Sequence, residues 1–242
     1  MYDDSDDRVA IVTGAGRGIG RATALALSKA GFTVVAMART DTDLVTLCDE
    51  ALDGTVVMHV GSVTHDRDVH MAFKTASVLG DLSVVVNAAG SAWFGPTTDC
   101  GLDDWRSVVQ TNLTGTFFCC REALRTMGDT GHIINIASVA GHQGLPNSAA
   151  YCASKWGVVG LTKSLAAEVR ASGRHGIHFT LLSPGSTDTP LWDALDDSPD
   201  TADMLQPDDV ANAILSIVTQ PPNISVDEMM LMPAKGILPF KR

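Results

Sequence analysis

The sequence predicts a doubly wound α/β domain, in which helices cover both faces of a parallel sheet. Apolar runs rich in β-branched residues alternate with helical patterns from residue 8 to residue 232, which is typical of βαβ units. The run at 82–86, Leu-Ser-Val-Val-Val, is almost wholly apolar, as expected for a strand buried on both faces. Because no linker or repeat interrupts the 242 residues, we expect a single domain over 1–242 with an acidic, flexible segment at 1–7.

Strands are expected where apolar and β-branched residues dominate a short run. In chain order these runs lie at 8–13, 33–38, 55–60, 82–86, 131–138, 177–183 and 227–232. Helices are expected at 21–30, 44–52, 66–78, 102–109, 114–127, 148–171 and 207–218. Gly31 provides a stop signal for the first helix. This order gives about seven parallel strands joined by right-handed crossovers.

The composition excludes several classes of protein. With 17 Lys and Arg against 28 Asp and Glu, the net charge is −11, so no nucleic-acid partner is expected. The acidic N-terminus does not resemble a secretory signal and no apolar run is long enough to span a membrane, so we expect a cytoplasmic protein. The five cysteines show neither a C-x-x-C pair nor a metal-ligand spacing with histidine, so no metal site is expected.

The first turn after a strand is rich in glycine. From Thr13 to Gly20 it reads Thr-Gly-Ala-Gly-Arg-Gly-Ile-Gly. Glycines there allow backbone N–H groups to approach a pyrophosphate, and the following helix directs its positive dipole end at the charge. The spacing excludes the nucleoside-triphosphate loop G-x-x-x-x-G-K-[ST] and also differs from G-x-G-x-x-G. The turn predicts a dinucleotide site, with a tight turn that binds no ligand as the alternative.

The end of the second strand indicates which dinucleotide binds. NAD sites usually place a carboxylate there, whereas NADP sites place a cation near the 2′-phosphate. Here Arg39 follows the strand and Arg17 lies in the glycine turn, which favours NADP(H) over NAD(H). The alternative is that both arginines are solvated surface charges, with Asp41 or Asp43 pairing with Arg39.

A tyrosine and a lysine lie near the start of the long helix at 148–171. Tyr151 and Lys155 are four residues apart, so both project from one helical face. A nearby ammonium stabilises a phenolate and lowers the tyrosine pKa, which suits proton transfer to or from a carbonyl or alcohol oxygen. Ser138, at the end of the preceding predicted strand, can place a hydroxyl beside the phenol.

Several short motifs follow one another along the chain. Thr13-Gly-x-x-x-Gly18-x-Gly20 precedes Asn87-Ala-Ala-Gly90, Asn112, Ser138, Tyr151-x-x-x-Lys155 and Pro184-Gly-x-x-x-Thr189. In order and spacing, over residues 8–232, they resemble the short-chain dehydrogenase/reductase family. The resemblance implies a Rossmann-type fold and NAD(P)-dependent hydride transfer between nicotinamide and a carbonyl/secondary alcohol pair.

The resemblance also implies a role for each motif. Tyr151 would be the general acid/base, Ser138 would hold and polarise the substrate oxygen, and Lys155 would lower the pKa of Tyr151 and bind the nicotinamide ribose. Asn112 would hold a water that relays protons to Lys155. The cofactor-binding residues would be Gly14, Arg17, Gly18, Ile19, Gly20, Arg39, Ser62, Val63, Asn87, Ala88, Ala89, Gly90, Tyr151, Lys155, Pro184, Gly185, Thr187 and Thr189.

Two features depart from the family pattern. Ser62 stands where many members carry an aspartate that contacts the adenine, and a serine there can make one hydrogen bond. The C-terminal run at 226–233 lacks the Asp-Gly-Gly ending common in 3-oxoacyl reductases. This departure weakens the assignment to that subgroup.

The substrate side is predicted to be apolar. Besides Ser138, the candidate residues are Ala92, Trp93, Phe94, Gln143, Leu145, Leu191 and Trp192, with core or lid packing as the alternative for the aromatic ones. The favoured function is an NADP(H)-dependent carbonyl reductase or alcohol dehydrogenase acting on a small molecule. A 3-oxoacyl thioester reductase and a non-catalytic sensor of nicotinamide redox state are the alternatives. The resemblance also implies a homo-oligomer, commonly a tetramer, formed through the helices at 114–127 and 148–171.

Overall fold

The computed structural model describes residues 8–51, 55–193 and 200–237, so the segment 1–7 lies outside the described residues. Seven parallel strands form one sheet in the order β3-β2-β1-β4-β5-β6-β7. The strands are β1 (Arg8–Thr13), β2 (Thr33–Ala38), β3 (Val56–Val60), β4 (Asp81–Asn87), β5 (Thr130–Ile136), β6 (Gly176–Pro184) and β7 (Glu228–Leu231). The strand order reverses between β1 and β4, which is the topological switch point of a doubly wound sheet. The predicted fold class is confirmed.

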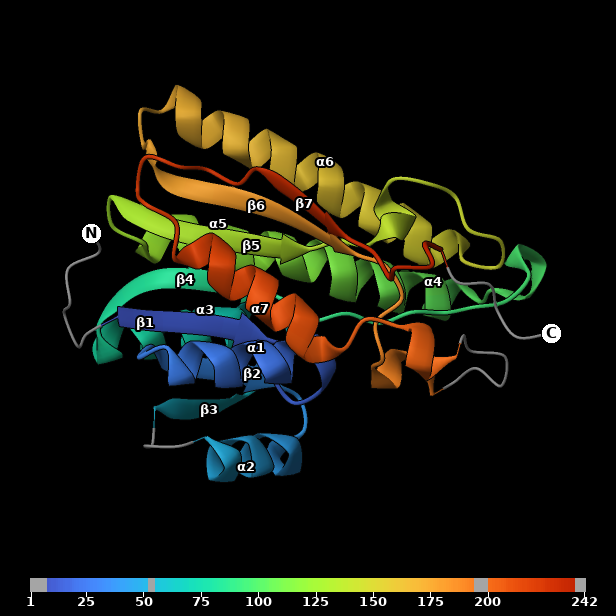
Figure 1. Ribbon diagram of the computed structural model, residues 1–242, viewed down its shortest axis with the longest axis horizontal. Coiled ribbons are helices and arrows are strands. Elements are labelled where there is room, and N and C mark those ends of the chain that lie inside the picture. The colour runs from blue at the N-terminus through green and yellow to red at the C-terminus, as the bar shows by residue number, and fades with distance from the viewer. Residues whose placement is uncertain (1–7, 52–54, 194–199, 238–242) are drawn as a thin grey trace.

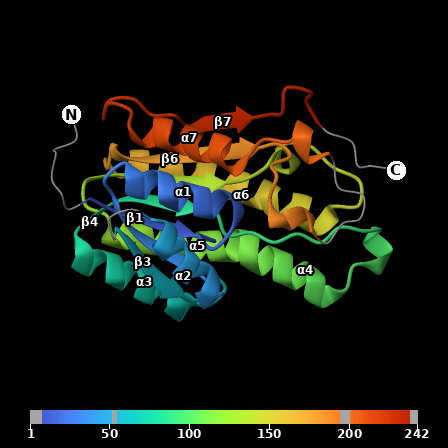
Figure 2. The same cartoon turned by 60° about the horizontal axis from the view of Figure 1, so that its bottom comes forward.

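Helices pack on both faces of this sheet (Figure 1). One face carries α1 (Gly18–Lys29), α2 (Asp41–Glu50) and α7 (Pro207–Val218). The other face carries α3 (Asp66–Leu79), α5 (Gly115–Thr126) and α6 (Ala149–Ala171), with α4 (Leu102–Val109) against α6. Figure 2 shows β7 and α7 at the opposite side of the molecule from β3 and α3.

The apolar strand sequences follow from this double covering. Along β1, Ala10 and Val12 face the core that contains α1 and α7, whereas Val9 and Ile11 face the core that contains α3 and α5. All four side chains are fully buried. A strand with two buried faces needs apolar residues at successive positions rather than at alternate ones.

Element boundaries match the prediction closely, with one difference that matters for the site. The expected strand 131–138 is too long at its carboxyl end, because β5 stops at Ile136. Ser138 lies two residues beyond and caps a short 3-10 turn, where its Oγ accepts a hydrogen bond from the backbone N–H of Ala140 at 3.2 Å. The serine is therefore held on a turn at the carboxyl edge of the sheet.

A π-helical turn joins the two helices expected at 102–109 and 114–127. Residues Gln110–Thr114 continue directly from α4 into α5. Such turns are rare, and many of those known lie at functional sites. The turn carries Asn112, whose side chain is buried.

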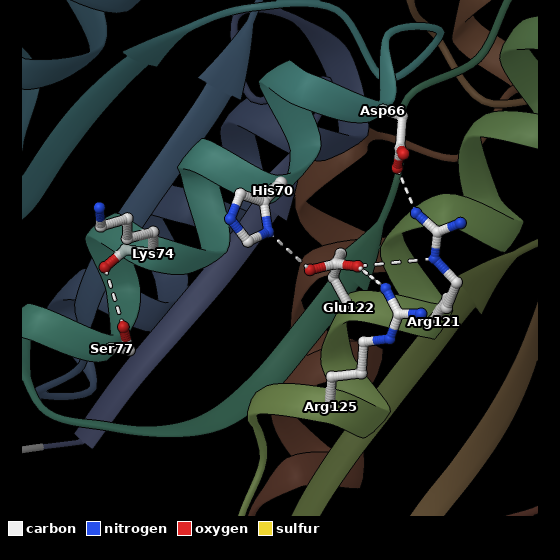
Figure 3. A network of polar contacts seen from close by, with 7 residues as sticks. All are labelled: Asp66, His70, Lys74, Ser77, Arg121, Glu122 and Arg125. Carbon is white, nitrogen blue, oxygen red and sulfur yellow. Dashed lines mark hydrogen bonds and ion pairs between the residues drawn. The ribbon is translucent and has the colours of Figure 1, made fainter.

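A buried carboxylate ties α5 to α3 (Figure 3). Glu122 on α5 is bonded to Nδ1 of His70 on α3 at 3.1 Å and to Nη1 of Arg125 at 2.7 Å. Arg121 forms an ion pair with Asp66 at the start of α3. Burial raises the pKa of Glu122, but the bonds with His70 and Arg125 outweigh it, so the net pKa is lowered. The ionised carboxylate therefore fixes the helix that follows the π turn.

Within the described ranges, none of the helices combines the length and the apolar sequence that crossing a bilayer would require.

Candidate active site

One cavity of about 740 Å³ opens beyond the carboxyl ends of the central strands. It runs from the glycine turn after β1 to the Ser138 turn after β5, as expected for a ligand site at a topological switch point. The predicted site residues that line it are Gly14, Arg17, Gly18, Ile19, Gly20, Arg39, Ser62, Val63, Ala88, Ala89, Gly90, Phe94, Ser138, Tyr151, Lys155, Pro184, Gly185, Thr187, Thr189 and Trp192.

The glycine turn is so closely packed that two of its positions exclude a side chain. Gly14 has φ 66°, and a Cβ there would lie 2.7 Å from Cα of Ala89. A Cβ on Gly20 would meet the Gly14 carbonyl group, 2.7 Å from its carbon. The turn is also tied to its neighbours, since Ala15 N–H donates to the Met37 carbonyl and Ala89 N–H donates to Thr13 Oγ1. The backbone at the start of α1 therefore borders the cavity directly.

Two arginines border the same end of the cavity but differ in their partners. Nε of Arg17 pairs with Oδ2 of Asp43 at 2.7 Å, and the Asp43 carboxylate raises the pKa of Arg17. Arg39 is exposed and has neither an ion pair nor a hydrogen bond among the described residues. The alternative pairing of Asp43 with Arg39 is therefore wrong, because Asp43 is bonded to Arg17.

Ser138, Tyr151 and Lys155 meet at the other end of the cavity. The ammonium of Lys155 donates to the Ile136 carbonyl at the end of β5 at 2.7 Å, and its Nζ lies 5.6 Å from the Tyr151 ring centroid. Lys155 is only 5% exposed. The first two turns of α6 therefore hold the phenol and the ammonium together over the Ser138 turn.

Burial governs the protonation of this group. It raises the pKa of Tyr151 to about 12, against the opposing effect of a hydrogen bond with the Ser138 side chain. It lowers the pKa of Lys155 to about 8. The lowered pKa expected for Tyr151 is thus not seen, because burial outweighs the hydrogen bond with Ser138. At neutral pH the phenol carries its proton and most of the lysine is charged.

The side chain of Asn112 is fully engaged by protein groups. Its Oδ1 accepts from Ser91 N–H at 2.8 Å, and its Nδ2 donates to the Ser91 carbonyl and to Ser154 Oγ, each at 2.9 Å. Ser154 in turn donates to the Tyr151 carbonyl at 2.7 Å. Asn112 therefore connects the turn that follows β4 to the helix that carries Tyr151, a contact that the sequence did not predict.

Two predicted cofactor residues differ in how they relate to the cavity. Asn87 does not line it, because its buried amide donates to Oδ1 of Asn135 at 2.7 Å, one strand away. Ser62 lines it and bonds to Thr64 Oγ1 at 2.8 Å, while its N–H donates to the Asp68 carboxylate at 3.0 Å. An aspartate is thus present beside this turn, six residues after Ser62.

Two of the three predicted aromatic residues, Phe94 and Trp192, line the substrate side of the cavity. Phe94 stacks on Trp192 with ring centroids 5.8 Å apart and planes 7° apart, and it lies 6.0 Å from the Tyr151 ring. Trp93 does not line the cavity defined by the described residues, because its ring packs against Gly95. Gln143 does not line it either.

Several lining residues were not among those predicted from the sequence. They include Ser91, Thr111, Pro146, Met232 and Ile237, together with Thr40 and Asp43 near the glycine turn. Ala92, Leu145 and Leu191 line it as expected. Pro146 could have been inferred because it lies between Ser138 and Tyr151. Met232 and Ile237 carried no comparable signal, since they follow the last strand.

Known proteins resemble this chain over almost its whole length. A family model for short chain dehydrogenase matches residues 8–200. An uncharacterized oxidoreductase of Staphylococcus aureus (strain USA300) is 35% identical over 230 residues, with 94% of this chain and 97% of that protein covered. A Staphylococcus saprophyticus protein, also an uncharacterized oxidoreductase, is 32% identical over 238 residues with the same coverage.

Two solved structures are similar over 94% of this chain and 97% of their own. The alcohol dehydrogenase from the archaeon Thermococcus sibiricus, complexed with 5-hydroxy-NADP, superposes with a TM-score of 0.85 at 26% identity. A variant of actinorhodin polyketide ketoreductase with NADPH superposes with a TM-score of 0.84 at 30% identity. This chain, with its Rossmann-type sheet, is therefore an oxidoreductase of the short-chain dehydrogenase/reductase family.

Proposed function

We propose that the protein is an NADP(H)-dependent oxidoreductase that interconverts a carbonyl compound and a secondary alcohol. The observation that carries this proposal is the shared cavity, which has the glycine turn at one end and Ser138, Tyr151 and Lys155 at the other. The ligands of the two similar structures, 5-hydroxy-NADP and NADPH, support the same class of cofactor.

The residues present fit a nicotinamide dinucleotide. The positions where a Cβ would collide, Gly14 and Gly20, leave bare backbone at the start of α1, where N–H groups and the helix dipole favour a pyrophosphate. Further contacts would come from Gly18, Ile19, Ser62, Val63, Ala88, Ala89, Gly90, Pro184, Gly185, Thr187 and Thr189, all of which line the cavity.

The protein's own side chains bind the substrate oxygen and transfer one proton to it. A reduced nicotinamide supplies a hydride to the carbonyl carbon when it is bound. Ser138 and Tyr151 hold the carbonyl oxygen, and the Tyr151 O–H donates the proton that completes the alcohol. The charged Lys155 then stabilises the phenolate until it regains a proton. Asn112, through Ser154, positions the helical turn that carries Tyr151.

NADP(H) is favoured over NAD(H) by the charges at the far end of the cavity. Arg39 is exposed and lines the cavity, so its guanidinium is available to a 2′-phosphate. Arg17 lies beside it on the glycine turn but is bonded to Asp43. We therefore assign the larger part of the preference to Arg39.

A homo-oligomer remains part of the proposal. Large apolar side chains are exposed on α4, α5 and α6, with Trp105 at 41%, Phe117 at 40% and Trp156 at 52%. Such side chains on neighbouring helices favour burial against a second copy. Size-exclusion chromatography with light scattering would measure the assembly directly.

A ketone screen tests the proposed function. Binding of NADPH and NADH to the full chain is measured first by calorimetry, and nicotinamide absorbance is then followed with a panel of ketones and aldehydes. We expect tighter binding of NADPH and its oxidation by at least one carbonyl compound. Bound NADPH that no carbonyl compound oxidises, with no reverse reaction from the matching alcohols, would contradict the proposal.

A further inference from the structure

The cavity wall around the proposed proton donor is aromatic and rigid. Phe94, Tyr151 and Trp192 form a row of three rings, here named the aromatic wall, with Phe94 between the other two. The indole N–H of Trp192 donates to the Thr187 carbonyl at 2.8 Å, so that donor is committed to the backbone. The loop of Phe94 is held as well, because Gly95 N–H donates to the Asn147 carbonyl at 2.8 Å.

The remaining lining of this end is apolar. Leu145, Pro146 and Leu191 line the cavity beside the wall. The cations that line the described cavity are Arg17 and Arg39 at the glycine-turn end and the buried Lys155, whose ammonium is bonded to the Ile136 carbonyl. The charge of Arg17 interacts with Asp193, next to Trp192, but Arg17 is bonded to Asp43. A substrate carboxylate or phosphate beside the aromatic wall would therefore have to compete with Asp43 or with the Ile136 carbonyl for a described cation there.

The flanking loop adds negative charge. Residues 186–193 and 200–206 contain four aspartates and no lysine or arginine. One of the four, Asp203, is paired with Lys235 at 2.7 Å. Asp193 directly follows Trp192 and is exposed. This charge disfavours anionic substrates, which include 2-oxo acids and thioesters carried on a phosphate-bearing arm.

We propose that the substrates are neutral ketones that bear an aryl group next to the carbonyl, a specificity that rests on the proposed function. With the oxygen between Ser138 and Tyr151, the aryl ring packs on the aromatic wall. The ketone gains a hydride at carbon and a proton from Tyr151 at oxygen, which gives the aryl carbinol. Aromatic contacts add affinity beyond burial of area, which corresponds to roughly a two- to tenfold preference over a saturated ring of similar size.

A matched pair of ketones tests this proposal. Acetophenone and cyclohexyl methyl ketone differ in the ring, and acetoacetyl-CoA supplies an anionic thioester. We expect kcat/KM to fall in that order with NADPH. In Phe94→Leu the preference for acetophenone over cyclohexyl methyl ketone should shrink toward one. Phe32→Leu changes a phenylalanine just before β2 that does not line the described cavity, and it should keep the preference.

A second readout does not depend on turnover. Ligand-observed NMR of acetophenone with the full chain should show binding that Phe94→Leu weakens and Phe32→Leu does not. Equal rates for the two methyl ketones, a faster reaction with acetoacetyl-CoA, or an unchanged preference in Phe94→Leu would overturn the aryl specificity and leave the proposed function intact. Acetophenone binding with the expected Phe94→Leu effect, but without NADPH oxidation by any ketone, would instead overturn the proposed function alone.

Discussion

The two ends of the cavity are built in different ways. At the glycine-turn end, six residues of one continuous turn between Gly14 and Gly20 line the cavity, and the constraint lies in φ angles and excluded Cβ atoms. At the substrate end, the wall is assembled from Phe94, Tyr151 and Trp192, which lie on three separate segments. Backbone-determined sites tolerate little change, whereas side-chain walls can be retuned.

The largest effect should follow from filling the glycine turn. In Gly20→Ala the new Cβ would collide with the Gly14 carbonyl group, so the turn must open. We expect loss of measurable NADPH binding and a stability loss of about 1–3 kcal/mol from overpacking, measured by calorimetry and by denaturant unfolding.

The matched control is Gly128→Ala. Gly128 lies between α5 and β5, outside the described lining of the cavity, with nothing within 4 Å of a Cβ built there. This change should raise stability by up to about 1 kcal/mol and leave NADPH binding unchanged. If Gly20→Ala bound NADPH normally, the close approach of the backbone at this turn would not be needed for cofactor binding.

The next largest effect concerns the exposed cation of the glycine-turn end. Arg39→Ala should weaken NADPH binding by about ten- to a hundredfold, the range expected for charge-assisted hydrogen bonds. The affinity for NADH should change little. Arg67→Ala, which removes an exposed arginine on α3 that does not line the described cavity, is the control. Equal losses for both nucleotides would remove Arg39 from the 2′-phosphate site.

A smaller effect of opposite sign is expected at Asp43. Its carboxylate is bonded to Arg17 and would compete with a 2′-phosphate for that guanidinium. Asp43→Asn should therefore tighten NADPH binding by up to roughly fivefold, with the gain reduced at high salt. Asp41→Asn, in the same helical turn, serves as the control, and weaker NADPH binding by Asp43→Asn would mean that the pair instead holds Arg17 in position.

How much the sequence predicts differs between these two ends. The strands and helices that carry the site follow from local periodicity, and β1, β2, α4 and α7 begin and end where predicted. The glycine turn was also predictable, since consecutive residues supply it. The aromatic wall was predicted only in part, because Trp93 and Phe94 are neighbours in sequence and only the fold decides which one lines the cavity.

Long-range contacts are the features that local patterns could not give. The π turn at Gln110–Thr114 has no distinctive composition, yet it directs Asn112 toward Ser91 and Ser154. The pairing of Arg17 with Asp43 joins residues 26 positions apart. Likewise, Ile237 lines the cavity from beyond the last strand, which requires knowledge of where the chain goes after β7.

The central claim is that Tyr151 supplies the proton while the rest of the cavity binds the cofactor. Tyr151→Phe removes the hydroxyl and keeps the ring of the aromatic wall. Turnover of the best ketone and the Kd of NADPH should be measured on the same preparation. The account predicts a fall in kcat of about 10²- to 10⁴-fold with the Kd nearly unchanged, and wild-type turnover in Tyr151→Phe would contradict it.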